Sequence, residues 1–277
     1  SITISEQGDF NLTVFMANIE NPPHGVSIRT IENTGLVEDG TLYGDIEVKT
    51  AGDEACILLP NGLRMVDESG TRLEGTLDIR LVYYNNISDG SLSTFPGGLV
   101  SRVEKYGSVL DGTFFPAGLV SIEIFDQYGR KARYFEQTAL KLTMAVPVRT
   151  FNPETKSEVQ AGDEIPVQSY DPETGIWKYH QTTNVSVGSR SDEYEVETWI
   201  PHLSWWSFDW FQGNYCNNGI ELIFKGDFGE CDCITMDGII RKKADNTYLR
   251  HISLNVCQDS SVFVTNAPTG LPVYIEW

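Results

Sequence analysis

Short apolar runs separated by turn residues recur along most of this chain. The segment from residue 75 to 83 is the clearest case, with apolar side chains at every second position: Leu77, Ile79, Leu81 and Tyr83. Alternation with a period of two is typical of a β-strand that buries one face and leaves the other in water. Helical spacing is rare throughout the chain. The pattern therefore predicts an all-β protein.

Similar runs predict further strands at residues 12–16, 43–49, 55–59, 140–148 and 194–200. The turn sequence Asp-Pro-Glu-Thr-Gly at 171–175 separates two such runs, 165–170 and 176–179, and predicts a hairpin. In the run 194–200 the residues on one side are Tyr194, Val196, Thr198 and Ile200. Pro201 follows and ends the ladder, because proline has no amide hydrogen to donate.

A chain of 277 residues exceeds what one hydrophobic core usually organises. We therefore expect two or three consecutive β-sandwich modules, with a boundary near residue 150, where a polar connection follows the run 140–148. The expected division is an N-terminal β segment at 1–40, a β-sandwich at 41–150, a β segment at 151–212 and a cysteine-bearing C-terminal β module at 213–277.

The charge balance narrows the choice of partners. Thirty-nine acidic residues oppose 20 basic ones, which gives a formal charge of −19. A chain of this charge is repelled by nucleic acid, so no nucleic-acid partner is expected. No apolar run reaches the length of a membrane span, so no membrane insertion is expected either. The acidic residues have two interpretations, a solubilising surface, which we favour, and a set of calcium ligands. No other cofactor is expected.

The five cysteines are unevenly placed. Cys56 stands alone, whereas Cys216, Cys231, Cys233 and Cys257 lie in the last quarter of the chain. Cys231 and Cys233 are too close in sequence to bond each other, which leaves two schemes in which each pairs with Cys216 or Cys257. Reduced cysteines and a zinc site are the alternatives, and zinc is the weaker because no CxxC spacing occurs. Disulfides favour a secreted or cell-surface protein.

The best candidate for chemistry is the tripeptide His202-Leu203-Ser204. Ser204 is placed to attack the carbonyl carbon of Leu203, with His202 as general base, so that the acyl group moves from nitrogen to oxygen and water hydrolyses the ester. The other interpretation is structural: His202 and Ser204 satisfy a strand end, and the tryptophans at 205, 206 and 210 pack in a core. Motifs of nucleotide-binding proteins, of serine hydrolases with a nucleophile elbow and of zinc proteases are absent from the sequence.

The run from Gly162 to Lys178, followed by Ile200-Pro-His-Leu-Ser-Trp-Trp-Ser-Phe-Asp209, resembles a segment shared by cartilage intermediate layer protein and many bacterial surface proteins. Its His-hydrophobe-Ser-Trp core is also similar to the paired ZU and UPA domains. The resemblance spans roughly residues 40 to 212. It implies a ZU-like sandwich at 41–150 and a UPA-like segment at 151–212. Some of these relatives cleave themselves before the serine, which implies a catalytic role for His202, Leu203 and Ser204, whereas others keep similar residues and do not cleave.

These observations predict an extracellular β-sandwich module of a larger modular surface or adhesion protein, either structural or binding a glycan or protein ligand. Trp177 and Tyr179 are candidates for stacking on sugar rings, although a sandwich core uses such residues more often. The alternative is autoproteolysis between Leu203 and Ser204, a single-turnover reaction in cis whose fragments remain associated. A glycosidase is a distant third interpretation, because no feature of the sequence singles out a pair of carboxylates.

Overall fold

The computed structural model describes residues 18–136, 138–213, 215–216, 220–225, 233–264, 267–268 and 272–277. Strands make up 62% of it and helix 2%, so the all-β prediction is confirmed. Within the described part of the chain the helical element is a single turn, α1 (Asp89–Leu92), which Ser88 caps. The strand predicted at residues 12–16 lies outside the described residues.

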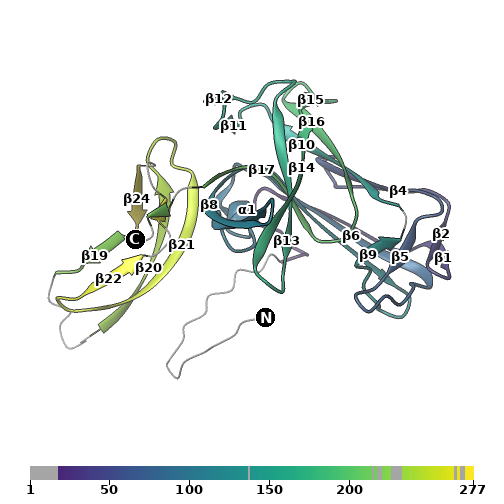
Figure 1. The fold of residues 1–277 in the computed structure, drawn as a ribbon, viewed down its shortest axis with the longest axis horizontal. Helices are drawn as coiled ribbons and strands as arrows, with labels where there is room; N and C mark the ends of the chain where they lie inside the picture. Colours follow the sequence, from purple (N-terminus) through teal and green to yellow (C-terminus); the bar gives the residue numbers. More distant parts are fainter. Residues whose placement is uncertain are drawn as a thin grey trace.

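The largest sheet has ten strands (Figure 1). It includes β1, which begins at residue 26, and β17, which ends at residue 213. In order across the sheet the strands are β17 (Trp205–Gly213), β13 (Glu164–Asp171), β14 (Ile176–Asn184), β7 (Val100–Lys105), β8 (Ser108–Asp126), β6 (Gly75–Tyr84), β1 (Val26–Glu38), β2 (Thr41–Tyr43), β5 (Arg64–Val66) and β9 (Tyr134–Glu136). The predicted hairpin is β13 and β14, with Asp171 opposite Ile176.

Strand β8 is 19 residues long and closes part of this sheet on itself. Its first half pairs with β7, and its second half pairs with β6. Strand β17 pairs with β8 along residues 205–213 and with β13 along residues 206–208. The strands β17, β13, β14, β7 and β8 therefore form a closed ring, and the His-Leu-Ser segment leads into it.

A second sheet of five strands lies against the large one. Its order is β15 (Ser186–Val187), β16 (Glu193–Ile200), β10 (Leu140–Pro147), β4 (Ala55–Leu59) and β3 (Ile46–Lys49). The main core fills the space between the sheets. It includes Leu77, Ile79 and Leu81 of β6, which are fully buried as the alternation predicted, and Leu142 and Met144 of β10. Gly118 of β8 is tightly enclosed there, because a Cβ at this position would lie 2.7 Å from the Met144 sulfur.

Strands from both sides of residue 150 share these two sheets. The segment 151–212 supplies β13, β14 and β17 to the large sheet and β15 and β16 to the smaller one. One buried cluster runs from Val37 to Trp210. The segments before and after residue 150 therefore do not form separate sheets or separate hydrophobic cores. The short pair β11 (Phe151–Asn152) and β12 (Ser157–Glu158) marks the polar connection.

The C-terminal strands form a separate layer beside this body (Figure 1). They are β18 (Tyr215–Cys216), β19 (Ile220–Ile223), β20 (Cys233–Lys242), β21 (Tyr248–Cys257), β22 (Ser261–Val264), β23 (Ala267–Pro268) and β24 (Val273–Glu276). Ile240, Leu249, Ile252 and Val264 form a small core of their own.

A disulfide and an ion-pair cluster hold this layer together and attach it to the body. Cys233 and Cys257 lie opposite each other on β20 and β21 and are disulfide-bonded, in agreement with one of the predicted pairings. The side chains of Cys216 and Cys231 lie outside the described residues. Arg241 of β20 pairs with Asp89 of α1 and with Glu276 of β24.

Candidate functional site

The His-Leu-Ser segment connects the last residue of β16, Ile200, to the first residue of β17, Trp205. It runs beside the segment that leads into β9. His202 forms an antiparallel bridge with Tyr134, and the Leu203 amide donates to the Arg133 carbonyl oxygen at 2.9 Å. Because β16 belongs to the smaller sheet and β17 to the larger one, the segment is where the chain crosses between the two sheets.

The structure does not join His202 to Ser204. Ser204 is almost buried, and its hydroxyl donates a hydrogen bond of 2.5 Å to the carbonyl oxygen of Tyr170 in β13. The His202 Nε2 atom instead lies 3.5 Å from the Ser169 hydroxyl oxygen. The base and nucleophile that the sequence predicts are therefore adjacent in the chain but engaged with different partners.

A second histidine, His180, lies beside His202 and Ser169. His180 of β14 lies with its Nε2 atom 2.8 Å from the Ser169 hydroxyl oxygen, and its ring centroid is 5.7 Å from that of His202. Both rings pack on Trp206, at 4.8 and 5.0 Å. Sequence reasoning missed His180, because nothing in the spacing shows that β13 and β14 bring it to the motif.

Both histidines are neutral near pH 7. Burial lowers the pKa of His202 below its ordinary value, and the neighbouring cations Arg133 and Lys178 act in the same direction. His180 is exposed at its edge, but its ring lies against Trp206. This desolvation, together with the proximity of His202, lowers the pKa of His180 to about 4. A neutral imidazole is the form that accepts a proton.

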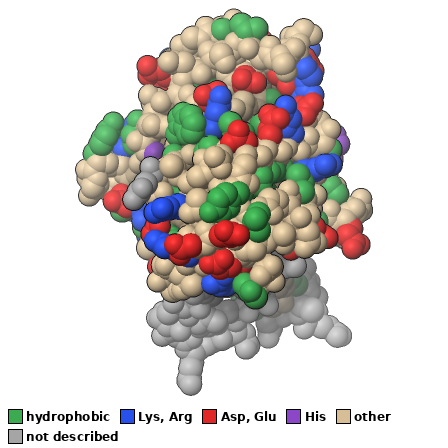
Figure 2. Space-filling view, turned by 90° about the vertical axis from the view of Figure 1, so that its right-hand side faces the viewer, with side chains coloured by type: hydrophobic (Ala, Val, Ile, Leu, Met, Phe, Trp, Pro, Cys, Tyr) green, Lys and Arg blue, Asp and Glu red, His purple; other side chains and the backbone are tan. Residues whose placement is uncertain are grey.

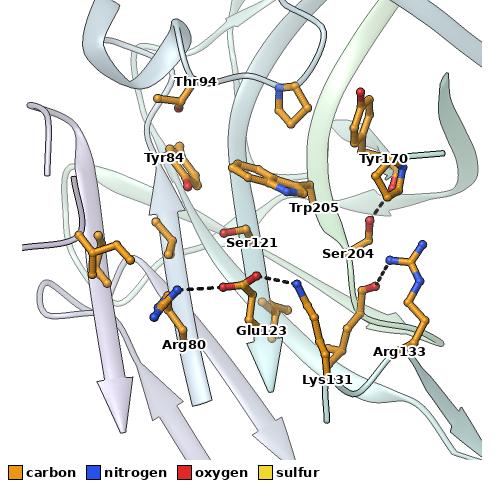
Figure 3. A pocket seen from close by; sticks show the side chains of 17 residues that line it. Arg80, Tyr84, Thr94, Ser121, Glu123, Lys131, Arg133, Tyr170, Ser204 and Trp205 are labelled. Carbon is orange, nitrogen blue, oxygen red and sulfur yellow. Dashed lines mark hydrogen bonds and ion pairs between the residues drawn. The ribbon is translucent and has the colours of Figure 1, made fainter. Parts of the chain in front are cut away.

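A cation lies at the carbonyl group that self-cleavage would attack. The Arg133 Nη1 atom donates to the Leu203 carbonyl oxygen at 3.1 Å (Figure 3). Arg133 and Leu203 are therefore connected twice, once through the Leu203 amide and once through this side chain. A donor in this position polarises the carbonyl and stabilises negative charge on its oxygen. The sequence gives no signal for this contact, because 70 residues separate the partners.

Ser204 and Leu203 also line a cavity of about 600 Å³ (Figure 3). Its wall includes the Trp205 and Tyr84 rings, whose centroids lie 5.2 Å apart, and the ring of Tyr170. This volume lies within the usual range of small-ligand sites, which are mostly apolar and carry a few placed polar groups.

The charged residues of the cavity are mostly basic. Arg80, Lys131 and Arg133 line it, together with one acidic residue, Glu123. Glu123 bridges Arg80 at 3.0 Å and Lys131 at 2.6 Å. Elsewhere the charges are mixed: on the face shown in Figure 2, Lys and Arg side chains lie among Asp and Glu side chains. The excess of positive charge is therefore a property of the cavity and not of the chain, whose formal charge is −19.

The prediction that Trp177 is available for sugar stacking is wrong. Trp177 is fully buried, packs against Phe95 and Phe114, and donates from its indole nitrogen to the Pro96 carbonyl oxygen at 3.1 Å. It belongs to a buried cluster distinct from the main core and from the small C-terminal core, together with Val103 of β7 and Leu119 of β8. Trp205 is half-buried and borders the cavity, so the accessible tryptophan at this site is the one that follows the His-Leu-Ser segment.

A metal ion needs several ligand side chains close together. Among the described residues, no three His, Cys, Asp or Glu side chains gather in a way that could hold a metal ion. Asp163, which is followed by the acidic residue Glu164, accepts hydrogen bonds from Asn152 and Gln160. In the described part of the chain, no helix is long and apolar enough to cross a membrane.

Fold and site together define an all-β protein with an aromatic and basic cavity next to a His-Leu-Ser crossover between two sheets. No family model matches the chain, and no curated protein or solved structure is significantly similar to it.

Proposed function

We propose that this chain is a carbohydrate-binding β module of a larger secreted or cell-surface protein, with the cavity beside Ser204 as its binding site. The observation that carries the proposal is the half-buried Trp205, which borders a cavity of about 600 Å³ together with Tyr84. An aromatic wall offers a flat apolar face to the C–H groups of a sugar ring, and polar groups at the rim orient the hydroxyls. The Cys233–Cys257 disulfide favours the extracellular location.

A glycan array probed with the folded chain tests this proposal, and Trp205→Leu is the informative variant. We expect the wild-type chain to bind a subset of glycans and Trp205→Leu to lose that binding. Trp199→Leu is the matched control, because Trp199 is 54% exposed on β16 and lies outside the cavity. Equal loss in both variants, or no binding by the wild-type chain, would argue against the cavity as a carbohydrate site.

Self-cleavage between Leu203 and Ser204 is a second candidate, and the Arg133 contact favours it. The Ser204 oxygen would form a bond to the Leu203 carbonyl carbon while the C–N bond breaks, and Arg133 would stabilise the oxyanion. The hydroxyl proton would pass to His202 and then to the released amine. Water would next hydrolyse the ester. For this reaction the Ser204 hydroxyl must first leave the Tyr170 carbonyl oxygen.

Denaturing electrophoresis of purified chain tests self-cleavage. In proportion to length, the 31.0 kDa chain would give pieces of about 23 and 8 kDa. Ser204→Ala should abolish them. Ser189→Ala, which removes an exposed hydroxyl, should not. The fragments would stay associated in native buffer, since β17 remains paired with β8 and β13. A single full-length band that hydroxylamine leaves unchanged would reject this route.

A further inference from the structure

The geometry of the cavity beside Ser204 points to a carboxylate-bearing sugar, such as a uronic acid unit of an acidic glycan, as its ligand. We infer that Arg133 binds the carboxylate while the sugar ring lies against Trp205. This inference rests on the proposed carbohydrate-binding function and specifies the class of glycan.

The first observation is the charge balance of the wall. Three basic residues and one acidic residue line the cavity, in a chain with 39 acidic and 20 basic residues. Glu123 contacts two of the bases, Arg80 and Lys131. One carboxylate cannot neutralise two cations, and Glu123 forms no ion pair with Arg133 within the described residues. An anion entering the cavity therefore meets a wall of net positive charge.

The second observation concerns Arg133 itself. Among the described residues it has no carboxylate partner, and its one side-chain hydrogen bond goes from Nη1 to the Leu203 carbonyl oxygen. Its Nε atom is buried and makes no hydrogen bond within the described part of the chain. A guanidinium has five N–H donors and binds carboxylates through two parallel hydrogen bonds. The buried Nε is closed to a ligand, but Nη1 and Nη2 together carry four N–H donors and only one of them is used by the Leu203 carbonyl oxygen. Arg133 therefore keeps Nη donors for a planar carboxylate.

The third observation is the relative position of cation and aromatic ring. Arg133 lies beside Leu203 and Ser204, and Trp205 is the next residue in the chain (Figure 3). The Trp205 ring lies near Tyr84 on the opposite side of Ser204 from Arg133 (Figure 3). A ligand that fills this space has a flat body on the indole and an anionic group at one edge. A sugar acid combines these two features in a single ring.

Hydroxyl groups complete the wall. Ser121, Thr94 and Tyr84 line the cavity; the Tyr84 phenol forms a hydrogen bond with Ser121, and the Thr94 hydroxyl donates to the Ser91 carbonyl oxygen. Burial raises the pKa of Tyr84 to about 12, so this phenol keeps its proton and can donate a hydrogen bond at any physiological pH. Such groups match the hydroxyls of a sugar ring better than the side chains of a peptide.

The experiment uses pairs of probes that differ only in charge. Oligogalacturonate of four units and its methyl ester are titrated into the full chain by calorimetry, and each carboxylate glycan on an array is compared with its own methyl ester. We expect the acid to bind at least about tenfold more tightly than the ester, with the difference falling as salt rises. The variant Arg133→Gln should lose about tenfold in affinity for the acid and leave the affinity for the ester unchanged.

Two further variants keep the result interpretable. Arg133→Lys retains the charge but not the planar fork, so it should lie between wild type and Arg133→Gln, and it serves if the glutamine variant does not fold. Arg102→Gln removes one charge from an exposed position outside the cavity and should change nothing.

The outcomes separate the inference from the function on which it rests. Equal affinity for acid and ester, or a preference for sulfated glycans that lack a carboxylate, overturns the carboxylate assignment while the cavity remains a carbohydrate site. An effect of Arg133→Gln no larger than that of Arg102→Gln also overturns it. Absence of binding to any glycan, acidic or neutral, overturns the proposed function itself.

Discussion

The hydroxyl of Ser204 donates its hydrogen bond to the main-chain carbonyl oxygen of Tyr170 at 2.5 Å. Tyr170 lies near the end of β13, and Ser204 immediately precedes β17, so this bond continues the contact between two paired strands past their last ladder position. In this conformation Ser204 supports the entry of the chain into the closed ring. The same hydroxyl would have to be released before it could act as a nucleophile.

We predict that Ser204→Ala destabilises the fold by about 0.5–1.5 kcal/mol, because the Tyr170 carbonyl oxygen loses the hydrogen bond of an almost buried hydroxyl. The measurement is urea denaturation of both chains followed by tryptophan fluorescence. Ser189→Ala, at an exposed serine, should stay within about 0.5 kcal/mol of wild type. Equal stability of Ser204→Ala and wild type would show that the hydrogen bond contributes nothing.

Asp209 should make stability depend on pH. Its side chain is fully buried on β17, where it accepts hydrogen bonds from Gln168 at 2.7 Å and from Ser207. Burial raises its pKa well above the ordinary value, and the Ser207 bond only partly opposes this. The folded chain therefore holds a proton that the unfolded chain releases above about pH 4, so the contribution of Asp209 to stability falls as pH rises beyond that point.

Asp209→Asn removes this proton while keeping the shape and the acceptor. We expect Asp209→Asn to become more stable relative to wild type as pH rises. The difference between their free energies of unfolding should grow by up to about 1.4 kcal/mol per pH unit between pH 4 and the folded-state pKa of Asp209. Urea titrations at pH 4.5, 6 and 7.5 measure this difference. Other carboxylates, such as Asp126, whose pKa is lowered, contribute equally to both chains and cancel. A difference independent of pH would mean that Asp209 is ionised in the fold.

Arg241 should hold the C-terminal layer against the body. Its side chain is 9% exposed and donates to both carboxylate oxygens of Asp89, at 3.1 and 2.7 Å, and to Glu276 at 2.6 Å. Asp89 and Glu276 are 52% and 56% exposed, so solvent screens these ion pairs and each contributes about 0.2–1 kcal/mol. Arg241→Ala should lower the melting temperature and increase the maximum dimension in small-angle scattering. Lys243→Ala, at an exposed neighbouring position, is the control, and matching behaviour of the two variants would contradict this role.

Reduction of the Cys233–Cys257 disulfide should loosen the same layer. The bond closes a loop with a sequence separation of 24 residues, for which loop entropy gives about 3 kcal/mol. We expect the double variant Cys233→Ala, Cys257→Ala to lose about this much stability in the C-terminal layer and to leave hydrogen exchange in β6 and β10 unchanged. Cys56→Ala is the control, because Cys56 is a free thiol in β4. Protection lost across both large sheets would show that the layer is not an independent unit.

The sequence by itself determined the strands and the faces that they bury. Alternation predicted β6, β10, β16 and the hairpin of β13 and β14, because side chains on a strand point to opposite sides and the apolar set identifies the covered side. It did not decide between a core position and an exposed position for Trp177, which is fully buried in β14. A single strand shows its period, but it does not show which other strands will enclose it.

The tertiary structure alone decided the composition of the site. His202, Leu203 and Ser204 are consecutive in the chain, so the sequence could single them out, yet their partners come from elsewhere: Ser169 and Tyr170 from β13, His180 from β14 and Arg133 from the approach to β9. Strand order and register place these groups, and both depend on long-range pairings that no local pattern encodes. The physical reason is that period-two burial fixes the face of each strand, whereas the fit of two packed sheets fixes its neighbours.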